Sequence, residues 1–265
     1  MASQPPATPS LPLFYAGLEP LSSSQHSNYR VRERTAAPHL ANVHAIPLTS
    51  DEFVSAQRFY PIVFSSGENS APLRLMGLNE RVNVFFDQDG NTLGETYVPA
   101  YARRYPFMLA RLRPEADELS LCFDPTSDII GPFEDGTPLF EDGKPGEGVN
   151  AILKFCEEFE MSANRTGFFM KELIDNDLLM EGEVTIQPTG SDQPFIYRGF
   201  QMVNEEKFRE LRGDVLRKMN QNGMLALIYA HLYSLQLIRE VFGRQLQQQK
   251  GPALDPAAAA ALGQG

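Results

Sequence analysis

The side chains in this sequence that could bind a transition metal are its four histidines, His26, His39, His44 and His231. A non-haem iron site of the facial type uses two histidines and one carboxylate. No histidine here is followed two residues later by Asp or Glu, the spacing that often supplies the carboxylate. His231 lies in an apolar run, which favours a hydrogen-bonded core histidine. We therefore predict no metal ion; the alternative is a site in which His44 meets His231 in the folded chain.

Three oxygen-bearing side chains, Asp87, Asp89 and Asn91, alternate as they do at the start of a calcium-binding loop. An EF-hand loop has its glycine at the sixth position and lies between two helices. Here Gly90 is at the fourth position, and no helical periodicity flanks the segment. Asp-Gly pairs are typical of tight turns, so we predict a hairpin turn.

Patterns for nucleophilic catalysis or phosphate binding do not occur. The sequence has no Gly-x-Ser-x-Gly, no Gly-x-Gly-x-x-Gly and no Gly-Lys-Ser/Thr segment. Cys122 and Cys156 lie in apolar runs without a local partner that would lower a thiol pKa, so we expect two reduced, buried thiols. We predict no catalytic residue and no cofactor, and an enzyme is the less favoured class.

Positive charge is concentrated in one segment of an otherwise acidic chain, where arginines alternate with aromatic residues: Tyr101, Arg103, Arg104, Tyr105, Phe107, Arg111 and Arg113. Arginine and aromatic side chains carry much of the energy of protein interfaces, and guanidinium groups recognise carboxylates. If the protein has a partner-binding surface, we predict that it includes Tyr101, Arg103, Arg104, Tyr105 and Phe107. Two adjacent arginines cannot both face the core, so at least one is available to solvent or a ligand. The competing interpretation, which the sequence favours, is that the arginines pair with acids of the 124–147 loop, such as Asp124 or Asp128.

Composition restricts the class of partner. The chain has 265 residues, with 34 acidic and 23 basic side chains, and a net charge of −11. Nucleic acids and anionic membranes require a basic surface, so neither is expected as the main partner. Hydrophobic residues make up 42% and charged residues 22%, which is typical of a globular protein.

The most apolar stretch, Met224–Ile238, is too short to cross a membrane, because a helix rises only ~1.5 Å per residue and must cross ~30 Å. A buried core helix is predicted instead. The segment Met1–Pro12 has neither the basic nor the apolar region of a secretory signal. We therefore expect a cytoplasmic protein without a membrane span.

The first half of the chain reads mainly as strands. Tyr29 and Val31 alternate with arginines in a predicted edge strand at 28–34. Thr49 and Glu52 have capping-box spacing and begin a helix that Pro61 ends. Further strands are predicted at 62–64, 73–78, 82–86, 93–98, 107–112 and 118–123, followed by a Pro/Gly/acid-rich surface loop at 124–148.

Helical periodicity dominates the second half. Helices are predicted at 149–159, from about 165 to 174, from Asn204 to about 219, and from 224 to about 249, with a hairpin at 183–203. The predicted fold class is α+β: a single domain at 18–249, with an antiparallel or mixed sheet from the N-terminal half packed against C-terminal helices. Residues 1–17 and 250–265 are expected to be disordered tails.

A set of short motifs occurs in order along the chain: Pro47-Leu48 with Glu52-Phe53, Tyr60-Pro61-Ile62-Val63-Phe64, Leu75-Met76-Gly77-Leu78, Asn83-Val84-Phe85 before Asp89-Gly90, Tyr97-Val98-Pro99-Ala100-Tyr101 with Arg103-Arg104-Tyr105-Pro106-Phe107, Leu139-Phe140 before Gly143, and Gly223-Met224-Leu225 with Ile228-Tyr229-Ala230-His231-Leu232 and Ser234-Leu235. In number and order they resemble the bacterial SapC-like family over roughly Pro20 to Arg244. The same name is used for a multi-span peptide-transport permease, which this sequence does not resemble.

The resemblance implies a setting rather than a reaction. The family is named for a gene beside those that export surface-layer protein, and similar genes lie near TonB-dependent receptors, halogenase-like proteins and cupin or JmjC-like oxygenases. It implies a non-enzymatic accessory protein, linked to surface-layer or outer-membrane-receptor physiology, that binds a protein or peptide partner. The alternative is a metal- or small-molecule-binding, enzyme-like protein of an oxygenase or halogenase cluster. The resemblance implies no catalytic residue.

Overall fold

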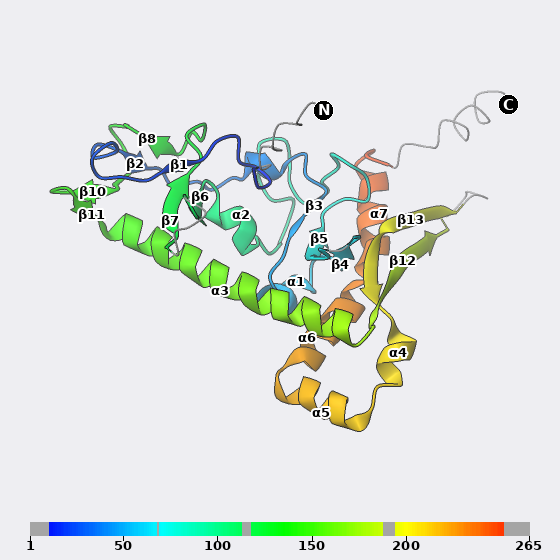
Figure 1. Cartoon of the computed structure of the whole chain (residues 1–265). Helices are drawn as coiled ribbons and strands as arrows, with labels where there is room; N and C mark the ends of the chain where they lie inside the picture. The colour runs from blue at the N-terminus through cyan, green and yellow to red at the C-terminus, as the bar shows by residue number, and fades with distance from the viewer. Residues whose placement is uncertain (1–10, 68, 113–117, 188–193, 252–265) are drawn as a thin grey trace, which may run out of the picture. The chain divides into compact units, whose positions relative to one another are not determined.

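The computed structural model describes residues 11–67, 69–112, 118–187 and 194–251 (Figure 1). The chain divides into two compact units. Unit 1 comprises Met1–Thr35 and Arg103–Glu160, and unit 2 comprises Ala36–Ala102 and Met161–Gly265. The described strands pair antiparallel throughout and pack with helices, so the predicted α+β class is confirmed. The predicted division into a domain at 18–249 and two tails stays a prediction.

Unit 1 is built from short antiparallel strands and the first part of a long helix. Its sheets have the orders β1-β7-β6, β8-β2-β9 and β10-β11. The bounds are β1 Glu19–Pro20, β2 Arg30–Val31, β6 Phe107–Ala110, β7 Ser120–Phe123, β8 Ile130–Gly131, β9 Thr137–Pro138, β10 Phe140–Glu141 and β11 Lys144–Pro145; α3 (Glu147–Asp175) continues into unit 2, and α2 (Ala100–Arg104) precedes β6.

The core of unit 1 forms where the buried face of β6 packs against the buried face of α3. Along β6 every second residue is buried, which places Phe107 and Leu109 on one face. Along α3, Val149 and Cys156 recur at helical spacing and pack into the same cluster, together with Phe123, Ile130 and Leu139. Removing side chains of this size from water contributes roughly 1.5–3 kcal/mol each.

Unit 2 contains the largest sheet, with strand order β12-β13-β4-β5-β3. Its strands are β3 Ala45–Pro47, β4 Ile62–Ser65, β5 Pro72–Leu75, β12 Leu179–Ile186 and β13 Phe195–Val203. Its helices are η1 Pro38–Leu40, η2 Ser50–Glu52, α1 Phe53–Ala56, α4 Glu205–Arg209, α5 Gly213–Gln221, α6 Met224–Ser234 and α7 Leu237–Gln247. The core lies between this sheet and the helices, with Phe53, Phe64, Phe169, Leu173, Val203 and Ile228 among its members.

The sheet differs from the prediction because it is not confined to the first half of the chain. The hairpin of β12 and β13 joins it through Phe200 and Gln201, which pair with Ser65 and Phe64 of β4. Sequence patterns indicate which segments are extended. Which strands pair with one another depends on long-range packing.

The predicted strands at 82–86 and 93–98 do not form, and only an isolated bridge joins Phe86 to Thr92. The Asn83 side chain explains this, because its Oδ1 accepts the backbone N–H groups of Phe85 and Phe86 at 2.8 and 3.2 Å. Such local bonds compete with strand pairing. The predicted turn is confirmed: Oδ1 of Asp87 accepts the backbone N–H groups of both Asp89 and Asn91.

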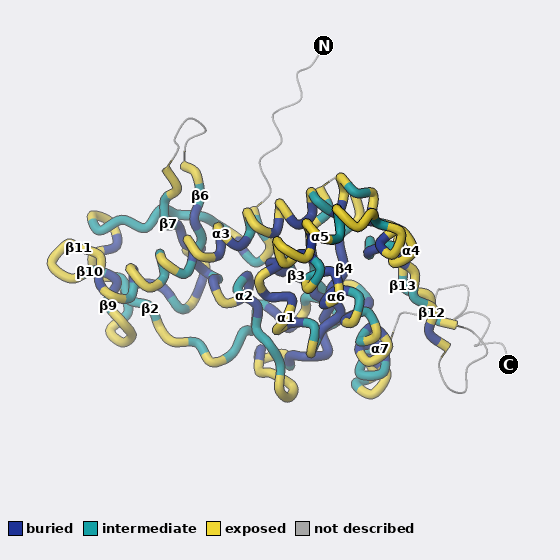
Figure 2. Tube along the Cα trace, turned by 90° about the horizontal axis from the view of Figure 1, so that it is seen from below, coloured by how far each residue is buried: buried dark blue, intermediate teal, exposed yellow. Residues whose placement is uncertain are grey.

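The helices also differ from the predicted bounds. The two helices expected at 149–159 and 165–174 are one continuous α3, in which Thr166 donates its hydroxyl to the Ser162 carbonyl at 2.8 Å instead of starting a new helix. Along α3, buried or half-buried residues recur every three or four positions between exposed ones, so each turn has a buried and an exposed side (Figure 2). The single helix predicted from 224 is α6 followed by α7, and the helix that Asn204 caps is α4 followed by α5.

A buried polar network in unit 2 begins at the predicted capping box. The Glu52 carboxylate accepts the Thr49 backbone N–H and hydroxyl, and also the Tyr97 hydroxyl at 2.9 Å and the Ala100 N–H at 2.7 Å. The Tyr97 carbonyl in turn accepts from Nη1 of Arg74 at 2.8 Å. Arg74 is completely buried, with its guanidinium carbon 4.3 Å from the centre of the Tyr60 ring. Burial lowers the pKa of Arg74, and the negative charge of Glu52 acts in the opposite direction.

Candidate functional site

The arginine–aromatic segment is mostly buried between residues 101 and 107, and its role as a partner-binding surface stays a prediction. Tyr101, on α2, is buried and belongs to unit 2, and Phe107 is buried in the core of unit 1. Tyr105 is half-buried and packs edge-on against Phe14 and Tyr15. The aromatic members of this segment therefore serve mainly in packing.

The two adjacent arginines have opposite environments, as the spacing predicted. Arg104 is 7% exposed; its Nη1 lies 3.3 Å from Oε1 of Glu160 and its guanidinium carbon 4.1 Å from the centre of the Phe159 ring. Arg103 is exposed, and its guanidinium carbon lies 5.1 Å from the centre of the Phe155 ring. Within the described part of the chain Arg103 has no ion pair.

The acids expected to pair with these arginines were the wrong ones. Asp124 accepts hydrogen bonds from the Ala16 N–H and from Thr126, and Asp128 pairs with Arg34. Arg104 instead lies along α3, where Glu160 is within reach. Arg113, the last arginine of the segment, lies outside the described residues.

We expect the two arginines to differ in their effect on stability. Arg104→Gln removes an ion pair and a cation–π contact from a buried side chain and should cost about 2 kcal/mol, or roughly 4–8 °C in melting temperature. Arg103→Gln alters an exposed side chain and should change stability by less than about 0.5 kcal/mol. Thermal melts of the two single variants measure the difference, and equal losses would contradict this assignment.

His231 is a core histidine held by the backbone at both ring nitrogens. Its Nδ1 lies 2.8 Å from the Ile62 carbonyl, and its Nε2 accepts the Val203 N–H at 3.1 Å, so the proton is on Nδ1. The imidazole stacks on Phe64 with 4.5 Å between ring centres. Burial lowers the pKa of His231 to about 4. Coordination of a metal by His231 would require one of these backbone bonds to break.

His44, the other residue of the metal alternative, is half-buried, and burial lowers its pKa while Glu80 acts in the opposite direction. Among the residues that the structure describes, no cluster of three or more His, Cys, Asp and Glu side chains could hold a metal ion. The two thiols are as predicted: Cys122 and Cys156 are free and buried, and burial raises the pKa of each to about 11.

A surface hollow of about 330 Å³ in unit 2 is a candidate for a protein interface. Its apolar lining consists of Phe168 and Phe169 from α3 and of Met224 and Leu227 from α6. Phe169 and Met224 are buried in the core, whereas Phe168 is 70% exposed. The sequence contained a signal for this, because two adjacent phenylalanines in a helix cannot both face the core.

Charged side chains form the rim of this hollow. Arg165 donates to both carboxylate oxygens of Asp51, and this pairing lowers the pKa of Asp51. Glu172 accepts from Lys218 at 2.7 Å. An apolar centre with a rim of polar pairs is the usual anatomy of a protein–protein interface.

Comparisons with known proteins give a family and no described relative. Across the described residues, no helix is both long and apolar enough to cross a membrane. No curated protein sequence and no solved structure matches the chain. The family model SapC matches residues 21–241, close to the range over which the motifs resemble that family. The chain therefore belongs to the SapC family.

Proposed function

We propose that this SapC-family protein is a non-enzymatic accessory protein of the cytoplasm that binds a protein or peptide partner, in the setting of surface-layer or outer-membrane-receptor physiology. The observation that carries the proposal is the exposure of Phe168 beside the hollow in unit 2. The partner contributes a large apolar side chain that fills the hollow and packs against Phe168.

Two physical arguments support this use of the hollow. A phenylalanine that is 70% exposed gains little from folding, but it gains roughly 1.5–3 kcal/mol when a partner covers it. The backbone that carries Phe168 is also held in place. Phe168 lies in the long helix α3, and the next residue, Phe169, packs edge-on against Phe53 with 5.6 Å between ring centres. A preorganised contact loses less conformational entropy on binding.

The Asp51–Arg165 ion pair at the rim can orient a bound partner. Both side chains are half-exposed, with 43% and 55% of their surface accessible, so the pair adds little to stability. Either charge can instead exchange its partner for a group of the bound protein, which favours specificity over raw affinity.

The test is a variant that removes the aromatic ring without affecting the core. Phe168→Ser should leave the melting temperature unchanged, because the ring is exposed, and should weaken binding of the native partner at least tenfold, because interface hot spots contribute about 2 kcal/mol or more. The measurement is capture from the native host with tagged protein, followed by titration of the purified partner with each variant.

Ile174→Ser is the matched control, since Ile174 is 50% exposed on the same helix but does not line the hollow. The proposal is supported if one captured protein binds equally well to the wild type and to the Ile174→Ser variant but weakly to the Phe168→Ser variant. Equal binding by all three proteins would place the interface elsewhere and reject this site.

A further inference from the structure

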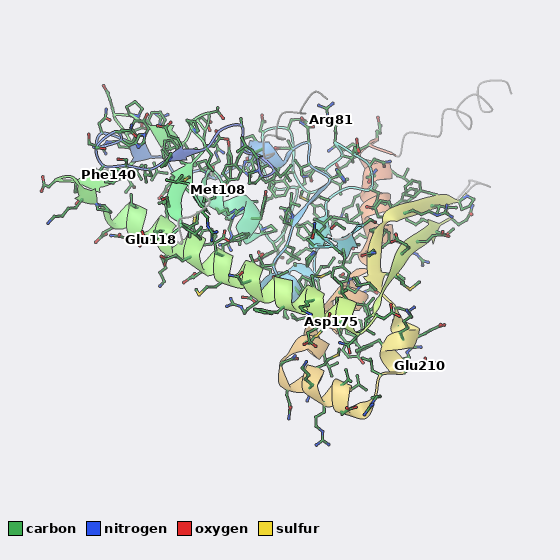
Figure 3. All side chains as sticks on the ribbon, viewed as in Figure 1. Arg81, Met108, Glu118, Phe140, Asp175 and Glu210 are labelled. Carbon is green, nitrogen blue, oxygen red and sulfur yellow. The ribbon has the colours of Figure 1, made fainter. Side chains whose placement is uncertain are left out.

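A second hollow, of about 450 Å³, lies entirely within unit 1 and has a different chemistry. It is lined by residues 27–30 around β2 and by residues of the 132–140 segment. Phe140, one of the lining residues and labelled in Figure 3, is the first residue of β10. The volume is in the range of small-molecule sites, which run from about 300 to 1,000 Å³.

The aromatic residues that line this hollow also pack against other side chains of unit 1. Tyr29 packs edge-on against His26 and Phe123, with ring centres 4.7 and 6.1 Å apart. The guanidinium carbon of Arg32 lies 3.7 Å from the centre of the Phe133 ring, and Phe140 packs against the core of unit 1. These contacts fix the rings before any ligand arrives, so the walls are preorganised.

The polar groups of the hollow retain unused hydrogen-bonding capacity. Arg30 donates through Nη1 to the Gly136 carbonyl at 2.8 Å, which leaves its other N–H groups available. The Asn28 amide, the Tyr29 hydroxyl and the Glu134 carboxylate have no hydrogen-bond partner within the described residues of the chain. The Arg30 guanidinium can only donate hydrogen bonds and the Glu134 carboxylate can only accept them, whereas the Asn28 amide and the Tyr29 hydroxyl can do both.

The charges of the lining indicate whether a charged or a neutral ligand fits the hollow. The positive charge of Arg30 and the negative charge of Glu134 cancel within the lining, so neither an anion nor a cation is favoured. An apolar ligand would remove water from these polar groups without replacing its hydrogen bonds. A ligand with many neutral hydroxyls satisfies both kinds of group, because each hydroxyl donates and accepts.

From this combination we infer that the hollow of unit 1 binds a neutral mono- or disaccharide. The hydroxyl groups of the sugar bond to Arg30, Asn28 and Glu134, and the apolar C–H face of a sugar ring packs on Tyr29 and Phe140. This site is independent of the proposed protein interface in unit 2.

The test is titration of the full chain with glucose, galactose, N-acetylglucosamine, maltose and cellobiose, followed by saturation-transfer NMR and calorimetry. At least one of these sugars should bind, with transfer strongest to its C–H protons. Glu134→Gln should weaken that sugar about tenfold, and Asn28→Ala about fivefold, as expected for the loss of a charged and of a neutral hydrogen bond. Both side chains are exposed, so folding should be unaffected.

Matched controls lie on the same unit outside the hollow. Glu141→Gln and Asn150→Ala change the same residue types at exposed positions and should leave binding unchanged within about twofold. No binding of any of the five sugars at millimolar concentration would overturn the inference, and so would equal binding by all four variants. Tighter binding of glucose 6-phosphate than of glucose would overturn it in favour of an anion site, and binding of triglycine in place of the sugars would do so in favour of a peptide site.

Discussion

Replacing Glu52 with alanine should lower the free energy of unfolding by about 4 kcal/mol, the typical cost of breaking a buried charge network from one side. The carboxylate accepts hydrogen bonds from Thr49, Tyr97 and Ala100, and its removal leaves these donors unpaired. It also removes the negative charge that faces the completely buried Arg74. Urea unfolding of the variant measures the loss.

A second substitution separates the charge effect from the lost hydrogen bonds. Because Glu52→Ala leaves the Arg74 charge uncompensated, the double variant Glu52→Ala/Arg74→Met should be more stable than the sum of the two single variants predicts, by about 1–3 kcal/mol. Asp51→Ala is the control: it removes the adjacent acid, whose ion pair with Arg165 is exposed, and should cost no more than about 1 kcal/mol. Additive losses in the double variant would show that Glu52 and Arg74 are not coupled.

The second large effect concerns the pH dependence of stability through His231. Its pKa is about 4 in the folded protein, below the ordinary value of 6.5, so the unfolded chain takes up a proton first as the pH falls. The contribution is fully present above pH 6.5 and is lost progressively between pH 6.5 and pH 4. Because one proton is taken up over this interval, the free energy of unfolding should fall by about 3 kcal/mol.

This pH dependence should disappear in a variant that cannot titrate. His231→Gln should be about 2 kcal/mol less stable than the wild type at pH 7, because it loses the stack on Phe64 and part of the bonding to Ile62 and Val203. Its stability should then change less between pH 6.5 and 4 than that of the wild type. The control His44→Gln alters a partly exposed imidazole and should keep most of the wild-type slope. Identical slopes in wild type and His231→Gln would exclude His231 as the source.

Features encoded by neighbouring residues could be predicted from the sequence. The Thr49–Glu52 capping box, the Asp87–Asn91 turn and the Asn204 cap are each a side chain bonding to backbone a few residues away, so their geometry depends little on the rest of the fold. Helical periodicity likewise identified Cys156, Phe169 and Leu173 as buried residues of α3, although Phe168 and Ile174, expected on the same face, are exposed. Ordered motifs identified the family.

Other properties were decided only by the tertiary structure, because they depend on which distant segments meet. The partner of Arg104 is Glu160 on α3 rather than an acid of the 124–147 loop, since a long side chain pairs with whatever charge packing brings within a few ångströms. Three further features depend on the same long-range packing: the addition of β12 and β13 to β4, the burial of Arg74 against the Tyr60 ring, and the identity of the exposed phenylalanine that lines the hollow. Local pattern determined the caps, the turn and the family of this chain. Contacts between residues far apart in sequence determined which predicted strands form, which charges are buried and which side chains remain available for binding.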